Sequence, residues 1–175
     1  GKLDFVGMTR FLLADPDYPN KIKEGRLEDV RPCLGCLHCF ETRNRNKKLE
    51  CRVNGDLGRE IMPEYQAKPA AKPKKVLVVG GGPCGMEAAR VAAERGHQVT
   101  LYERGSRLGG LVPLAAIVKD CETPELLDFV RYQERELKKA GVTVRTGTAL
   151  TSAVVKQEKP DALVVAAGAV HPEVA

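Results

Sequence analysis

The sequence contains no tryptophan, and aromatic residues make up only 5% of the chain. The net charge is +5, and a local cluster of lysines at 68–75 lies among prolines and alanines rather than among aromatic side chains. Surfaces that bind nucleic acids combine basic patches with aromatic residues on which bases stack. The basic stretch is therefore interpreted as a solvated linker, and no nucleic-acid partner is expected.

Long apolar runs are also missing. The longest, Val76–Val79 and Leu163–Ala167, are far shorter than the roughly 20 residues that span a bilayer, so no membrane association is expected. The first residues lack the charged-then-apolar pattern of a secretory signal, and we expect a cytoplasmic protein. Six cysteines in such a protein more often serve metal or redox chemistry than disulfides.

The pattern of the chain changes near residue 75. Before it, Leu3–Met8 is expected to form a short strand and Lys21–Asp29 a short helix. After it, apolar strands alternate with helices, which predicts an α/β fold with a Rossmann-like, doubly wound parallel sheet. The expected strands are Val76–Val79, Gln98–Tyr102, Val142–Val144 and Ala162–Ala166. The expected helices are Pro83–Arg95 and a second helix that has Thr123 as N-cap, begins at Pro124 and is ended by Gly141.

A cysteine motif precedes this alternating region. Cys33, Cys36 and Cys39 are spaced C-x2-C-x2-C, and Cys51 follows after eleven intervening residues. Four thiolates complete either a tetrahedral zinc site or a 4Fe–4S cluster. Structural zinc sites usually come as two separated CxxC pairs, whereas three crowded cysteines let a loop wrap around a larger group. We predict a 4Fe–4S cluster, with zinc as the alternative, and expect His38 to be a solvent-facing spacer.

A glycine-rich turn follows the first apolar strand of the alternating region. Residues 80–85 match G-x-G-x-x-G, open a helix, and precede a strand that ends in the acid Glu103. Gly80 is expected to make the tight turn, Gly82 to admit a pyrophosphate, and Gly85 to let the helix pack closely. Pro83 begins the helix whose N-terminal amides face the phosphates. Glu103 is expected to accept hydrogen bonds from ribose hydroxyls and to disfavour a 2′-phosphate.

Further residues bear on which dinucleotide is bound. Arg104 and Leu108-Gly109-Gly110 follow the acid, at a place where the chain must pass close to a cofactor. Ala167 and Gly168 close the fourth strand at the same edge of the sheet. These features favour FAD, or its ADP half, over NAD. A packing role is expected for Cys84, which begins the first helix.

Together these motifs resemble the iron–sulfur flavoenzymes related to 2,4-dienoyl-CoA reductase, trimethylamine dehydrogenase and the 2-enoate reductases, a group of Old Yellow Enzyme-like NADH:flavin oxidoreductases. Residues 1–10 and 14–17 look like the last barrel strand of these enzymes and the phosphate-binding turn after it. Residues 31–36 and 51–54 look like their cluster loop. The spacing of the first three cysteines is closer to trimethylamine dehydrogenase than to dienoyl-CoA reductase, which has one more residue before its third cysteine.

The resemblance implies four segments. These are the end of an FMN-binding TIM barrel at 1–26, a 4Fe–4S segment at 27–63, a linker at 64–74 and an incomplete FAD- or ADP-binding domain at 75–175. Arg10 would touch the FMN phosphate. Electrons would pass between FAD, the cluster and FMN in a reductase of enoates or dienoyl-CoA that depends on NAD(P)H, or in an amine dehydrogenase. No catalytic residue is assigned, because nearly all of the barrel is missing.

The implied partners are the rest of the FMN barrel and an NAD(P)-binding domain, in the same protein or in another subunit. Association into a homo-oligomer is also open. Two other functions are kept as alternatives, a non-catalytic module that holds structural ADP and an NAD-binding domain stapled by zinc. The identity of the bound metal and nucleotide would distinguish these alternatives.

Overall fold

The computed structural model describes residues 2–117 and 123–168. The chain divides into two compact units, one of residues 1–66 and 123–132 and the other of residues 67–122 and 133–175. The first boundary lies within the stretch predicted as a linker. Within the described residues, no helix has the length and apolar character needed to cross a membrane.

The first unit consists of short helices joined by irregular segments. Its elements are α1 (Arg10–Ala14), α2 (Tyr18–Lys23), the 3-10 helix η1 (Leu27–Asp29), α3 (His38–Asn44) and the first part of α6 (Pro124–Lys139). The expectation of one helix over residues 21–29 is wrong. Gly25 has a left-handed backbone (φ +73°) that separates α2 from η1, because a right-handed helix cannot continue through such a residue.

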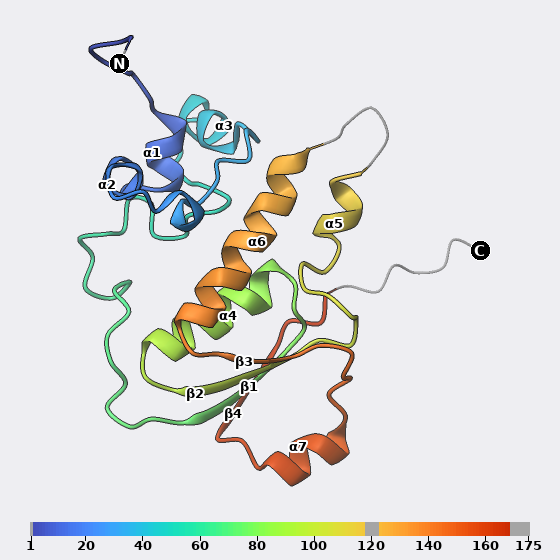
Figure 1. Ribbon diagram of the computed structural model, residues 1–175. Coiled ribbons are helices and arrows are strands. Elements are labelled where there is room, and N and C mark those ends of the chain that lie inside the picture. The colour runs from blue at the N-terminus through green and yellow to red at the C-terminus, as the bar shows by residue number, and fades with distance from the viewer. Residues whose placement is uncertain (1, 118–122, 169–175) are drawn as a thin grey trace. The chain divides into compact units, whose positions relative to one another are not determined.

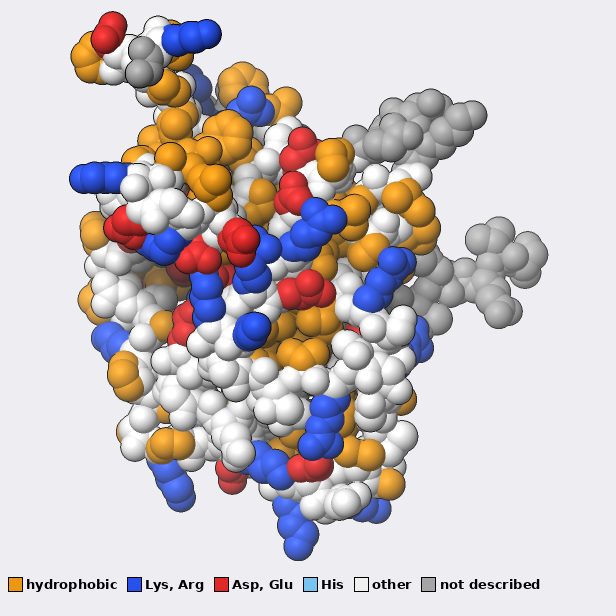
Figure 2. Space-filling model, in the orientation of Figure 1, with side chains coloured by type: hydrophobic (Ala, Val, Ile, Leu, Met, Phe, Trp, Pro, Cys, Tyr) orange, Lys and Arg blue, Asp and Glu red, His pale blue; other side chains and the backbone are white. Residues whose placement is uncertain are grey.

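The expectation of a strand over Leu3–Met8 is also wrong. Residues 3–8 form neither helix nor strand, and Phe5 is 93% exposed. A strand needs a neighbour to satisfy its backbone N–H and C=O groups, and the four strands of the described residues pair only with one another. Other apolar side chains of this unit are exposed as well, and Figure 2 shows apolar side chains gathered over its helices.

The second unit contains a parallel sheet of four strands (Figure 1). The strands are β1 (Lys75–Val79), β2 (Gln98–Tyr102), β3 (Thr143–Arg145) and β4 (Ala162–Val165). Their order is β3-β2-β1-β4, and Val78 of β1 lies opposite Leu101 of β2 and Val164 of β4. The predicted α/β parallel sheet is confirmed. The central strand β1 is buried along most of its length, as its unbroken apolar run predicts.

The helices of this unit are α4 (Pro83–Glu94), α5 (Val112–Ala115), α7 (Ser152–Glu158) and the second part of α6. Helix α4 packs on the sheet, against β1, β2 and β4. Figure 1 shows α4 and α6 on one side of the sheet and α7 on the other. Helix α4 begins at Pro83 and buries Met86 and Ala89, and Gln133 of α6 donates to the Pro83 carbonyl at 3.1 Å. The loops that follow β1, β2 and β4 therefore meet at the carboxyl ends of the strands.

Candidate functional site

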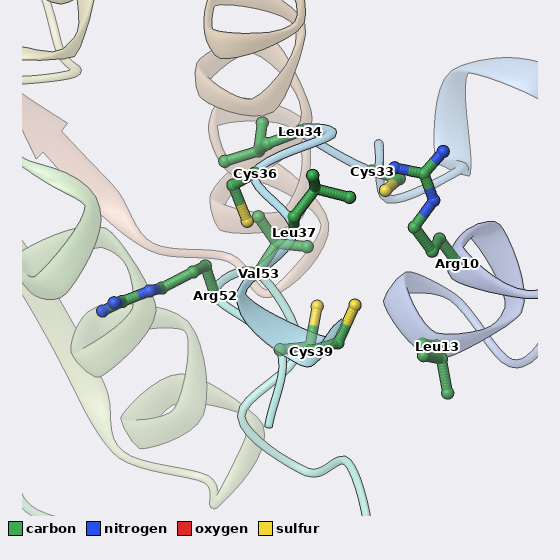
Figure 3. A pocket seen from close by; sticks show the side chains of 10 residues that line it. Arg10, Leu13, Cys33, Leu34, Cys36, Leu37, Cys39, Arg52 and Val53 are labelled. Atoms are coloured by element: carbon green, nitrogen blue, oxygen red, sulfur yellow. The ribbon is translucent and has the colours of Figure 1, made fainter. Parts of the chain in front are cut away.

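The four cysteines of the motif line one pocket of the first unit (Figure 3). Cys33 and Cys36 lie in the irregular segment before α3, Cys39 lies in the first turn of α3, and Cys51 lies in the loop after it. All four are free thiols. The pocket holds about 330 Å³ of space, part of which is open to solvent. Residues far apart in the motif thus face a common volume.

Two left-handed residues shape the loop that carries the first three thiols. Gly35 has φ +64° and Leu37 has φ +56°. Glycine adopts this conformation without steric cost, whereas a leucine pays of order 1–2 kcal/mol for it. These two residues turn the chain twice between Cys33 and Cys39, which allows cysteines separated by two residues to face one pocket. Sequence reasoning missed Leu37, since nothing in the residue type signals a positive φ.

The rest of the pocket lining fits a thiolate-held group. Its other walls are aliphatic and cationic: Leu13, Leu34, Leu37, Val53, Arg10 and Arg52. Cations favour the thiolate over the thiol, and apolar walls limit the access of water to a bound cluster. Among residues 2–117 and 123–168, no three side chains of His, Cys, Asp or Glu are grouped as a single metal ion would require. The four thiols therefore line one pocket, but they do not converge on a single point within it.

His38 does not face solvent as expected. Its side chain is only 17% exposed and lies between two carboxylates. Nε2 is 3.4 Å from Glu50 Oε2, and Nδ1 is 3.6 Å from Glu41 Oε2. His38 is the first residue of α3, and Glu50 precedes Cys51. The imidazole therefore reaches from α3 to the segment that carries the fourth thiol.

Two buried polar side chains hold the cysteine segments against α1. Asp15 is 4% exposed, and its carboxylate accepts hydrogen bonds from Lys21 Nζ at 2.7 Å and from the Arg31 main-chain N–H at 2.8 Å. Asn54 is 3% exposed and donates to the Leu13 carbonyl at 2.9 Å. Arg31 lies just before Cys33, and Asn54 just after Cys51. Both ends of the motif are therefore tied to one element by satisfied buried hydrogen bonds.

The glycine-rich turn forms the second candidate site, in the second unit. Gly80 has φ +101°, and a Cβ there would overlap the Ala166 carbonyl. A Cβ on Gly85 would overlap the Gly80 carbonyl oxygen. A Cβ on Gly82 would meet only the Gly110 Cα, at 4.0 Å. Gly80 and Gly85 are thus required by close backbone packing, while Gly82 leaves space above the start of α4.

Glu103 closes the turn from the end of β2. Its Oε2 accepts a hydrogen bond from the Gly81 N–H and its Oε1 one from the Gly105 N–H, both at 2.6 Å. Leu108 is buried, and its side chain fills the space beside Gly81. The Gly109 N–H donates to the Gly81 carbonyl at 2.8 Å. Sequence reasoning expected the acid and the second glycine pair here but missed their direct contacts with Gly81.

The structure brings most of the predicted nucleotide residues to one sheet edge. The end of β4 joins this edge through the Ala166 N–H, which donates to the Val79 carbonyl at 2.8 Å, and Ala167 and Gly168 follow, both exposed. Arg104 is also exposed. The expected packing role of Cys84 is wrong, because this residue is exposed at the first turn of α4. Arg10, which the resemblance implied at an FMN phosphate, lines the cysteine pocket of the first unit.

Comparisons with known proteins match both sites. The family described as pyridine nucleotide-disulphide oxidoreductase matches residues 46–171. An NADH oxidase of Thermoanaerobacter brockii is 42% identical over 171 residues, which is 96% of this chain and 26% of that protein. A probable N-methylproline demethylase of Rhizobium meliloti is 40% identical over 176 residues, 99% of this chain and 26% of that protein. The chain thus spans about a quarter of the length of these relatives.

A solved structure is similar over nearly the whole chain. The 2-naphthoyl-CoA reductase in complex with 2-naphthoyl-CoA superposes with a TM-score of 0.92 at 40% identity. The match covers 99% of this chain and 26% of the reductase. At this identity the likeness extends beyond the parallel sheet to the segment that carries the cysteines.

Proposed function

Because the chain belongs to the pyridine nucleotide-disulphide oxidoreductase family, we propose that it forms the electron-transfer portion of an iron–sulfur flavoprotein oxidoreductase. In this proposal Cys33, Cys36, Cys39 and Cys51 hold a 4Fe–4S cluster, and the glycine turn with Glu103 binds FAD. The relatives, an NADH oxidase and a 2-naphthoyl-CoA reductase among them, support a redox role.

One observation carries the proposal, the gathering of four free thiols around a single pocket. A cubane cluster takes one thiolate at each of its four irons, so its ligands surround a volume of several atoms. The aliphatic walls would limit the access of water to the cluster. When bound, such a cluster supplies one-electron transfer, and flavins convert between single electrons and hydride.

At the nucleotide site the chain supplies amides, space and one carboxylate. A pyrophosphate would lie in the space above Gly82, where main-chain N–H groups in the first turn of α4 would donate hydrogen bonds to it. The Glu103 carboxylate, held by Gly81 and Gly105, can still accept hydrogen bonds from ribose hydroxyls, because each oxygen has more than one lone pair. Its charge would repel a 2′-phosphate. Arg104, Leu108 to Gly110, Ala167 and Gly168 would border the same cofactor.

The whole enzyme would extend well beyond this chain. We propose that the remaining three quarters include an FMN-binding barrel and an NAD(P)-binding domain, which together would select the substrate. The relatives differ in what their names say they act on, and they include an NADH oxidase, a probable N-methylproline demethylase and a 2-naphthoyl-CoA reductase. The substrate class therefore depends on residues outside this chain.

The test is anaerobic purification followed by three measurements on one sample. Iron and acid-labile sulfide should each reach about four per chain, with broad absorption near 400 nm. The nucleotide released by denaturation should have the yellow spectrum of FAD. Stoichiometric zinc without iron would overturn the cluster and favour a zinc-stapled NAD-binding domain. Colourless ADP would overturn the flavin part and favour a structural nucleotide.

A further inference from the structure

Gln133 of α6 holds the first turn of α4. Its Nε2 donates a hydrogen bond to the Pro83 carbonyl at 3.1 Å, and the residue is only 5% exposed. A main-chain carbonyl accepts and never donates, so the amide nitrogen of Gln133 rather than its oxygen faces Pro83. Two residues that are 50 positions apart are therefore joined at the turn where the proposed pyrophosphate would lie.

The Pro83 carbonyl does not need this bond to complete the helix. In an α-helix each carbonyl accepts from the N–H four residues further on, and a carbonyl oxygen has two lone pairs. The Gln133 amide is thus a second donor to a group that the helix itself satisfies. An apolar side chain of the same size at this position would leave the carbonyl bonded, so folding should tolerate the replacement.

The bond acts on the N–H of Cys84, which belongs to the same peptide as the Pro83 carbonyl. This peptide is trans and planar, so its C=O and its N–H point in opposite directions. Pro83 has no N–H of its own, which makes the N–H of Cys84 the first donor of the helix. It precedes the hydrogen bond from the Met86 N–H to the Gly82 carbonyl at 2.9 Å, and amides at this place have no acceptor within their helix.

A donor on the carbonyl has two effects on the N–H of the same peptide. It restrains the plane of the peptide and therefore the direction of the N–H. It also polarises the peptide, because hydrogen bonds in a chain strengthen one another. We propose that Gln133 is a positioning residue, which orients and strengthens the Cys84 N–H as a donor to the pyrophosphate of the bound nucleotide. This inference rests on the proposed function, because it presumes a pyrophosphate at the start of α4.

The experiment measures nucleotide binding to the complete flavoenzyme freed of its bound nucleotide. FAD is titrated by calorimetry, and ADP and adenosine are then measured as competitors of FAD, so that only this site is read out. ADP contains the pyrophosphate, whereas adenosine contains only the base and the ribose. Stability is followed by urea unfolding of the same samples.

The variants are Gln133→Leu and Gln133→Met, two apolar replacements of similar size, so that one can be used if the other does not fold. Gln66→Leu is the matched control. Gln66 is exposed and also donates to a main-chain carbonyl, that of Glu60 at 3.2 Å, so the control removes the same kind of bond away from the glycine turn.

In Gln133→Leu the affinities for FAD and ADP should fall about three- to tenfold, because a hydrogen bond to a charged phosphate is weakened rather than removed. The affinity for adenosine and the stability should stay near wild type, and Gln66→Leu should change none of these quantities. An equal fall for ADP and adenosine would show a general disturbance of the turn and would overturn this inference alone. An unchanged ADP affinity would do the same, and so would a failure of both Gln133 variants to fold. A wild-type protein that binds neither FAD nor ADP would instead overturn the proposed function, and this inference with it.

Discussion

The main-chain N–H of Gly81 donates a 2.6 Å hydrogen bond to Oε2 of Glu103, 22 residues further along the chain. This bond joins the glycine turn after β1 to the end of β2, and the Gly105 N–H occupies the other carboxylate oxygen. One side chain therefore shapes the glycine turn and presents negative charge where we propose that a ribose binds.

Glu103→Gln should weaken nucleotide binding at least tenfold. The amide keeps the size of the side chain, but it loses the charge and turns one acceptor into a donor that faces a main-chain N–H. Each hydrogen bond to a charged group contributes about 1.5–3 kcal/mol. The affinity for FAD and ADP is measured by calorimetry on protein freed of nucleotide. Glu64→Gln is the control, because Glu64 is exposed, and an unchanged affinity in Glu103→Gln would contradict the assignment.

Gly85→Ala and Gly82→Ala should separate folding from binding. The methyl group at Gly85 would overlap the Gly80 carbonyl, so we expect a loss of stability of about 1–3 kcal/mol. The methyl group at Gly82 meets only the Gly110 Cα, at 4.0 Å, so stability should stay near wild type while nucleotide binding is lost. Urea unfolding and nucleotide affinity are measured on both variants. Tight nucleotide binding by Gly82→Ala would show that phosphates do not approach this turn.

Glu158 should make the second unit sensitive to acid. Its carboxylate accepts a hydrogen bond from Lys75 Nζ at 2.6 Å, and this bond with the Lys75 charge holds the pKa of Glu158 below its ordinary range. A lowered pKa in the folded protein means that the stabilisation is complete above the unfolded value, near pH 4.3. It is lost as the pH falls through the lower folded value.

The comparison is between wild type and Glu158→Gln, unfolded by urea from pH 7 down to pH 3. The variant should be less stable at pH 7, and the difference should shrink as the pH drops below about 4.3. A difference that stays constant over this range would show that the ion pair with Lys75 does not contribute through the charge of the carboxylate.

Replacement of a motif cysteine should remove iron. Cys51→Ser leaves three thiols at the pocket, so we expect iron per chain to fall severalfold and the absorption near 400 nm to be lost. Cys84→Ser is the matched control, because Cys84 is an exposed free thiol outside the pocket and should leave the iron content unchanged. Equal iron in the two variants would exclude Cys51 as a ligand.

The periodicity of the second half was sufficient to predict its fold. The apolar run at Val76–Val79, the glycine turn and the acid at the end of the next strand predict a parallel sheet, which the structure confirms. The family resemblance carried by the cysteine and glycine motifs is confirmed by the relatives. Local signals suffice here because each strand and each turn is encoded by residues adjacent in the chain.

The first unit was predicted less well. The segment Leu3–Met8 has the composition of a strand but forms none, since strand formation depends on a neighbour that its own residues do not encode. His38 was expected in solvent because its immediate neighbours give no sign of Glu50, which lies twelve residues away. The position of Arg10 at the cysteine pocket was missed for the same reason.

The sequence by itself determined the family resemblance and the candidate groups, four spaced thiols and a glycine turn followed by an acid, because these depend on residue type and local spacing. Only the tertiary structure decided what surrounds them. Arg10, the first residue of α1, lines the same pocket as the four thiols. Both carboxylate oxygens of Glu103 accept hydrogen bonds from main-chain N–H groups, those of Gly81 and Gly105. Such contacts join residues distant in the chain, and their geometry follows from packing rather than from any local pattern.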